Sequence, residues 1–175
     1  MRKFIFLFFL TIGTSLQAQE KNATFLEKVQ TIDGIIENLY ASISGEAGEP
    51  RDWELLRYFF HPEAKLIPSG RNQNGDYVAR YMTVEDYINT SGAWLIENGF
   101  YERELHRVKT EFGPITHVFS TYESFHSVKE STPFMRGINS IQLLNDGKRW
   151  WIINIFWTQE TEANPIPSEY LPIKN

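Results

Sequence analysis

The sequence predicts an α+β fold in which a helical first half is followed by an antiparallel sheet. Between residues 25 and 98 the apolar side chains recur at steps of three and four, which is typical of amphipathic helices. After Gly99 they alternate with polar side chains, which is typical of strands. The chain has 175 residues and no internal repeat, so we expect one domain over residues 19–160 and a Pro-rich, extended tail over residues 161–175.

Residues 1–18 have the composition of a secretory signal peptide. Arg2 and Lys3 give a positively charged start, and an apolar run follows over residues 4–12. This run is too short for a transmembrane helix, which needs about 20 apolar residues. We therefore expect cleavage near Ala18 and a periplasmic or secreted protein without a membrane anchor. An uncleaved amphipathic segment is the alternative.

Three helices are expected before Gly99. The first spans residues 25–43, where the apolar stripe has helical spacing. The second begins near Asp52 and ends before Pro62, because the residue that precedes a proline avoids helical geometry. The third begins at a predicted capping box formed by Thr83 and Asp86.

The remaining elements are predicted to be strands. Two short strands flank a turn rich in Gly, Pro and Asn, and four longer strands follow the third helix. Because the longer strands are joined by short turns, their order predicts an antiparallel meander. The predicted strands span residues 64–67, 77–82, 100–112, 115–128, 134–144 and 149–158.

The last two strands are expected to pair around a two-residue turn at Asp146-Gly147, which places Asn139 opposite Asn154. One face of this hairpin is then apolar except for the two asparagines. A buried amide without a partner costs about 1 to 3 kcal/mol, so the two side chains either bond each other or line a pocket. A longer loop with a bulge would shift this register by one residue.

The opposite face of the same hairpin carries too many large apolar side chains for a solvated surface. It predicts a subunit interface, and we expect a homodimer through this outer face of the sheet. The residues assigned to the interface are Arg136, Ile138, Trp151, Ile153 and Trp157.

Two motifs stand out in this order of elements: FHPEAKLI at residues 60–67 and DGKRWWI at residues 146–152. Together they resemble the nuclear transport factor 2-like (NTF2-like, or SnoaL-like) superfamily, and in particular its secreted bacterial members. The resemblance covers residues 24–158. It implies a cystatin-like roll, in which a strongly bent antiparallel sheet forms a cone around three N-terminal helices, with a cavity between them and frequent dimerisation. Members include isomerases, dehydratases, cyclases and hydrolases that use acid-base chemistry, as well as binding modules, so the fold does not give the function.

The chain departs from the isomerase pattern of that superfamily at two positions. The catalytic carboxylate of the pattern falls near Ile67 and Pro68, neither of which can transfer a proton. A histidine that often lies in the pocket corresponds to Asn154, which can orient a carbonyl group but cannot titrate.

The titratable candidates for catalysis are His61, Glu102 and His106. His61 lies where the second helix meets the rim of the cone, and it is either an acid-base group or a histidine that ends a helix. Glu102 and His106 share one strand face with Glu104. We expect this face to lie outward or at the rim, because an inward face would bury two carboxylates without an evident cation.

The candidates for ligand binding are residues whose side chains would line an apolar pocket with a polar focus. They are Asn139, Asn154, Tyr122, Trp94 and Phe156. Two hypotheses follow: a module that binds a small apolar or amphipathic molecule, or an acid-base enzyme of the lyase, isomerase or hydrolase type. A cavity that lacks a His or a carboxylate would argue against the enzyme.

Composition limits the other partners. The formal net charge of −5 does not suit nucleic-acid binding, so no such partner is expected. The chain has no cysteine and no closely spaced histidines, so we expect no metal site, and no motif suggests a cofactor.

Overall fold

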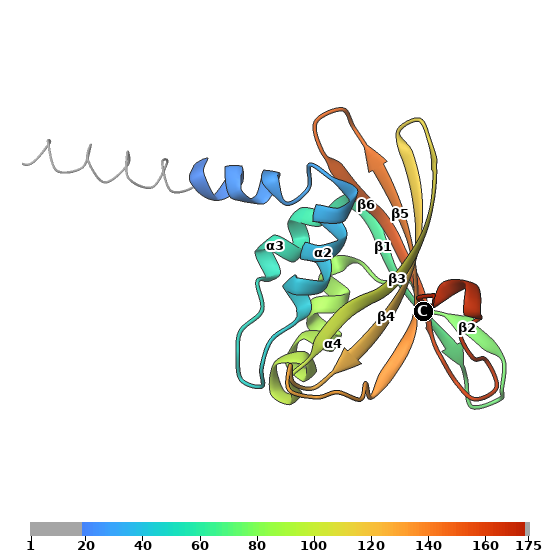
Figure 1. Cartoon of the computed structure of the whole chain (residues 1–175). Coiled ribbons are helices and arrows are strands. Elements are labelled where there is room, and N and C mark those ends of the chain that lie inside the picture. Colours follow the sequence, from blue (N-terminus) through green and yellow to red (C-terminus); the bar gives the residue numbers. More distant parts are fainter. Residues whose placement is uncertain (1–18, 174–175) are drawn as a thin grey trace, which may run out of the picture.

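The computed structural model describes residues 19–173, and the predicted signal peptide over residues 1–18 lies outside the described residues. A curled six-stranded sheet packs against helices on one of its faces (Figure 1). The predicted α+β class, with a bent sheet around N-terminal helices, is therefore confirmed.

The principal helices are α2 (Ile32–Ile43), α3 (Trp53–Phe59) and α4 (Val84–Asn98), and a further helical stretch covers residues 19–27. The strands are β1 (Phe60–Arg71), β2 (Tyr77–Ala79), β3 (Tyr101–Phe112), β4 (Ile115–Phe125), β5 (Met135–Asn145) and β6 (Trp150–Gln159). A 3-10 turn, η1 (Ser168–Tyr170), follows them.

The strand order in the sheet is β2-β1-β6-β5-β4-β3. The predicted meander is confirmed for β3 to β6, in which each strand is antiparallel to the next. β1 lies parallel to β6, because the chain crosses over through α4 and three strands before it returns to the middle of the sheet. β1 is also longer than predicted, because it starts directly where α3 ends.

The first predicted helix is interrupted between residues 27 and 32. The carbonyl of Val29 accepts a hydrogen bond from the Trp150 backbone amide at 2.8 Å, which ties this break to the start of β6. Thr31 then caps α2, because its hydroxyl accepts a hydrogen bond from Gly34 N at 2.9 Å. The predicted continuous helix over residues 25–43 was therefore wrong in this detail.

The predicted capping box of α4 is confirmed. The Thr83 hydroxyl accepts from Asp86 N at 3.1 Å, and the Asp86 carboxylate accepts from Thr83 N at 2.9 Å. Gly99 ends the helix with a φ of 67°, a left-handed conformation that favours glycine.

The hydrophobic core lies between the helices and the concave face of the sheet. A buried arginine, Arg51, crosses the edge of this core. Its guanidinium donates to the carbonyls of Ile43, Gly45 and Leu95 at 3.0, 2.7 and 2.8 Å, so it joins the end of α2 to α4. Hydrogen bonds to several carbonyls satisfy a buried guanidinium that would otherwise be costly.

The register of the β5–β6 hairpin differs from the predicted one. The turn holds four residues, so Asn145 faces Trp150, and a bulge at Ile153 then shifts the pairing by a further residue. Every side chain after this bulge lies on the face opposite to the predicted one. The expected Asn139–Asn154 pair does not form, and Trp157 is the residue opposite Asn139.

The C-terminal segment packs on the outer face of the sheet. Thr121 Oγ1 donates to the Tyr170 carbonyl at 2.6 Å, and the Tyr170 ring contacts the Phe119 ring edge-on at 4.9 Å. The segment also lines a surface pocket together with Ile138 and Phe156. Among residues 19–173, no helix is both long and apolar enough to cross a membrane.

Candidate functional site

A cavity of about 200 Å³ lies inside the cone, between α2, α4 and the concave face of the sheet. Its wall is mainly aliphatic and aromatic, and the polar groups gather on one side. The residues that line it are Leu39, Tyr40, Ile43, Leu56, Phe60, Leu66, Tyr87, Ser91, Trp94, Leu95, Phe100, Glu102, Tyr122, Met135, Asn139, Ile155 and Trp157. An apolar pocket with a few convergent polar groups is the usual form of a small-molecule site.

Glu102 is the carboxylate of this cavity. It lies near the start of β3, and its two oxygens accept hydrogen bonds from Asn139 Nδ2 and Ser124 Oγ, each at 3.2 Å. Within the described part of the chain it has no ion-pair partner. Burial raises the pKa of Glu102 to about 7, and the two hydrogen bonds oppose that rise. The side chain therefore exchanges its proton near neutral pH.

Three tyrosines surround this carboxyl group. Burial, together with the charge of Glu102, raises the pKa of Tyr40, Tyr87 and Tyr122, so all three remain protonated. The hydroxyls of Tyr87 and Tyr122 have no hydrogen-bond partner among residues 19–173, which leaves them available to a ligand. Tyr122 passes over Gly137, where a Cβ atom would come within 2.6 Å of the tyrosine hydroxyl.

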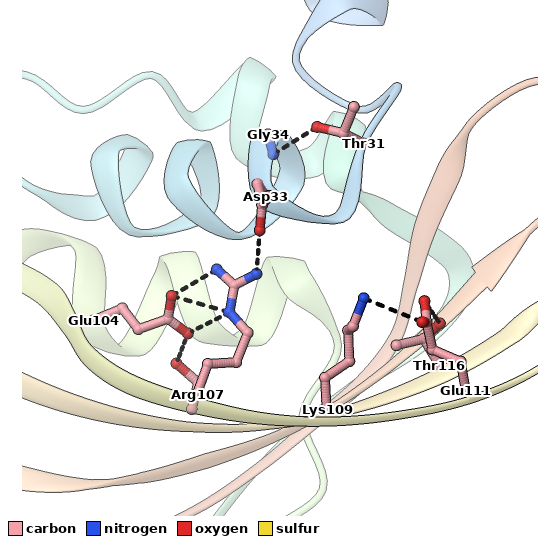
Figure 2. A network of polar contacts seen from close by, with 9 residues as sticks. Thr31, Asp33, Gly34, Glu104, Arg107, Lys109, Glu111 and Thr116 are labelled. Carbon is pink, nitrogen blue, oxygen red and sulfur yellow. Dashed lines mark hydrogen bonds and ion pairs between the residues drawn. The ribbon is translucent and has the colours of Figure 1, made fainter. Parts of the chain in front are cut away.

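An ion-pair network joins this polar side of the cavity to the surface between α2 and β3. Arg107 donates to both oxygens of Glu104, and its Nη1 lies 2.6 Å from the Asp33 carboxylate (Figure 2). Glu104 also accepts from Ser120 Oγ at 2.5 Å, and Ser120 lies 2.7 Å from the Tyr40 hydroxyl. Glu102 and Tyr40 line both the cavity and the surface groove.

Glu102 and His106 do not share a strand face, although the alternation predicted that they would. A bulge at Leu105 shifts the register of β3 against β4, so His106 leaves the face that carries Glu102, and Arg107 takes the inward position. The expectation that this strand face lies outward or at the rim was wrong for Glu102, which lines the cavity, whereas Glu104 lies at the surface groove. Arg107 supplies the cation for Glu104, whereas Glu102 is accommodated by its raised pKa.

His61 lies away from the cavity. Its ring meets the Trp151 ring edge-on with the centroids 5.9 Å apart, and its Nδ1 accepts from Glu63 N at 3.2 Å. His61 therefore matches the second alternative, a histidine at the end of a helix, and it does not reach the cavity.

The five predicted ligand-binding residues separate into two groups. Tyr122, Asn139 and Trp94 lie in the cavity wall. Asn154 donates from Nδ2 to Gln142 Oε1 at 2.8 Å, and Phe156 lines a surface pocket beside the C-terminal segment, so both belong to the outer face. The Ile153 bulge is the physical reason, and it also brings Trp157, expected at the interface, into the cavity wall.

Sequence reasoning missed Tyr40 and Tyr87 as polar members of the site. Both occupy positions in the apolar stripes of their helices, where a tyrosine is indistinguishable from ordinary core filling. Among residues 19–173, no group of three or more His, Cys, Asp or Glu side chains is placed to hold a metal ion.

No protein-family model and no curated protein matches the chain. Solved structures do match its fold. An NTF2-like protein with a cystatin-like fold from Novosphingobium aromaticivorans aligns with a TM-score of 0.58 at 13% identity, over 86% of this chain and 93% of that one. A cystatin-like protein of unknown function from Nostoc punctiforme gives 0.54 at 11% identity, over 77% and 96%.

A further match is a candidate ketosteroid isomerase from Parabacteroides distasonis, with a TM-score of 0.51 at 10% identity, over 78% of this chain and 98% of that one. At such identities the likeness establishes the fold and no activity.

Proposed function

We propose that the protein binds a compact, largely apolar molecule in the cone, and that Glu102 and Asn139 orient the one polar group of this ligand. The observation that supports this proposal is a single carboxyl group in a mainly apolar wall, hydrogen-bonded to a neutral amide. The size of the cavity fits this class, since a dry cavity of about 150 Å³ lined by aliphatic and aromatic side chains is enough to hold benzene.

A second candidate function is acid-base catalysis of the lyase, isomerase or hydrolase type. The observation that favours it is the pKa of about 7 at Glu102, because a general acid or base is most effective when its pKa lies near the working pH. His61 and His106 have no part in this second proposal, since neither lines the cavity.

Native mass spectrometry of the purified mature protein tests for a retained molecule and identifies its mass. Two variants test whether the retained molecule lies in the cavity. Ser91→Phe fills the cavity from α4, whereas Ala93→Phe adds the same ring at an exposed position of the same helix. We expect S91F to lose the extra mass and A93F to keep it. Retention by both variants would refute the cavity as the binding site.

The Glu102→Gln variant separates the two functions. Glutamine keeps an acceptor for Asn139 but cannot exchange a proton at neutral pH. A binding protein is expected to keep its ligand in E102Q with a modest loss of affinity. An enzyme is expected to bind the molecule and to lose turnover by at least about 100-fold, the lower end of what general acid-base catalysis supplies.

We also propose that the protein is exported to the periplasm or secreted after cleavage near Ala18. The support is the positively charged start and short apolar run of the first residues. N-terminal sequencing of the protein from its native host is expected to begin at Gln19, and a start at Met1 would contradict export by this route.

A further inference from the structure

A chain of three hydrogen bonds runs from the surface ion pair to the cavity. Asn139 Nδ2 lies 3.0 Å from the Tyr40 hydroxyl, the Tyr40 hydroxyl 2.7 Å from Ser120 Oγ, and Ser120 Oγ 2.5 Å from Glu104 Oε1. Arg107 holds the Glu104 carboxylate from its other side (Figure 2). Tyr40, Ser120 and Asn139 are all buried.

The direction of this chain is determined at Glu104. A carboxylate that is paired with an arginine only accepts hydrogen bonds, so the Ser120 hydroxyl must donate to it. The single proton of Tyr40 then points to Ser120, because Ser120 has only lone pairs left. The oxygen of Tyr40 must in turn receive a proton from Asn139. Only the amide nitrogen of Asn139 can supply it, and the amide oxygen therefore points the other way.

That amide oxygen is open to the cavity. Among residues 19–173 no donor reaches Asn139 Oδ1, yet the atom is not sealed in the core. The only fully enclosed side-chain nitrogen or oxygen without a hydrogen bond in that range is Arg136 Nε. Because Asn139 is part of the cavity wall, a bound molecule meets its carbonyl oxygen rather than its NH₂ group.

We propose that the Glu104–Arg107 ion pair is a positioning element that orients the Asn139 amide, and that it thereby makes the cavity select a ligand with a hydroxyl or N–H group over one with a carbonyl group. This inference rests on the proposed ligand-binding function and names the class of its ligand. The hydroxyls of Tyr87 and Tyr122 can donate or accept, so they serve both ligand types and leave the selection to Asn139.

The variant Glu104→Gln is expected to reverse the chain. The donors of Arg107 attract the glutamine oxygen, so the glutamine NH₂ faces Ser120 and donates to it. Ser120 then donates to Tyr40, and Tyr40 donates to Asn139. The amide of Asn139 must turn over to accept this bond, which presents its NH₂ group to the cavity.

Cyclohexanol and cyclohexanone are suitable probes, because they share one apolar ring and differ in whether the oxygen can donate. Binding is measured by NMR titration at about pH 6, where the Glu102 carboxyl, with its pKa of about 7, is mostly protonated and can itself donate or accept. We expect the wild type to bind cyclohexanol about tenfold more tightly, as one net hydrogen bond allows, and E104Q to prefer cyclohexanone. Equal preference in the wild type, or an unchanged preference in E104Q, would overturn the proposal.

A second variant and a second measurement keep the test decisive. Ser120→Ala breaks the chain of hydrogen bonds without reversing it. We therefore expect the ratio of the affinities for cyclohexanol and cyclohexanone to approach one and not to invert. Nuclear Overhauser contacts between the Asn139 side-chain NH₂ and the Tyr40 ring report the orientation without any ligand, and they are expected in the wild type only. If neither probe binds while these contacts are present, the binding function fails and the orientation stands; if the contacts are absent, the orientation fails.

Discussion

Asn139 on β5 donates to Glu102 on β3 across the intervening strand β4, with 3.2 Å between Nδ2 and Oε1. The bond crosses the concave face of the sheet and not its backbone ladder. Because the sheet curls, side chains two strands apart approach each other inside the cone, and this curvature brings the polar groups of the cavity together.

Glu102 makes the stability of the protein depend on pH. Its pKa is about 7 in the folded state, against 4.5 for an ordinary glutamate, so the folded protein holds this proton more tightly than the unfolded chain does. The resulting stabilisation is complete below about pH 4.5 and is lost as the pH rises through about 7. The shift corresponds to about 3 kcal/mol at most.

We therefore expect Glu102→Gln to gain stability relative to the wild type between about pH 4.5 and pH 8, by up to about 3 kcal/mol. Urea unfolding of both proteins across this range measures the difference. Parallel pH profiles of the two proteins would contradict the burial of this carboxyl.

Gly137→Ala is expected to destabilise the fold and to displace Tyr122. A Cβ at this position would lie 2.4 Å from the Thr158 carbonyl and 2.6 Å from the Tyr122 hydroxyl, and overpacking of this kind costs about 1 to 3 kcal/mol. Gly70→Ala is the matched control, because nothing lies within 4 Å of its added methyl group. Chemical denaturation measures the free energy of unfolding of both variants, and we expect a lower value for Gly137→Ala. Equal values would show that the backbone at Gly137 can move to accept the methyl group without loss of stability.

Thr83→Ala is expected to lower the free energy of unfolding by about 1 kcal/mol, because it removes the acceptor that caps Asp86 N. Thr90→Ala, in the middle of the same helix, serves as the control, since the Thr90 hydroxyl caps no helix end and donates to the Asp86 carbonyl at 2.7 Å. If T90A lowered the free energy of unfolding as much as T83A does, the capping hydrogen bond would contribute no more than a side-chain bond in the middle of the helix.

We expect the protein to form a homodimer through the part of the outer sheet face that the C-terminal segment leaves uncovered. Phe112, Ile115 and Ile153 lie there, and Phe112 is 82% exposed. Ile115→Glu is expected to shift the sedimentation equilibrium toward the monomer, whereas Val128→Glu, at an exposed position outside this face, is not. A wild-type protein that sediments as a monomer would refute the interface.

Most elements of the fold could be predicted from sequence, because one buried face imposes a period on each helix and strand. The capping box at Thr83 and the stop at Gly99 have specific residue signatures, and both were found. The break before Thr31 was not predictable from the apolar stripe, since it depends on a contact with Trp150, which is far away in the sequence.

The site was predicted only in part, and two bulges explain most of the errors. Ile153 lies in a run of apolar residues, and Leu105 lies between Glu104 and His106. In neither place does the alternation of polar and apolar residues give a sign that the residue is unpaired. Tyr122 and Asn139 lie on strands without such an interruption before them, and both were placed in the cavity wall. Asn154 follows a bulge and was assigned to the wrong face, and His106, which also follows a bulge, was wrongly expected to share a face with Glu102.

The bulge at Ile153 also shifts the pairing of β6 with β5 by one residue, so the side chains after it lie on the opposite faces from those of a regular strand. From Asn154 onward, large side chains occupy both faces of the strand: Ile155 and Trp157 face inward, and Phe156 faces outward. Deleting a single residue here would exchange the two sets and replace part of the cavity wall without altering the strand order. An indel in β6 is therefore a short evolutionary route from one ligand preference to another within the same cone.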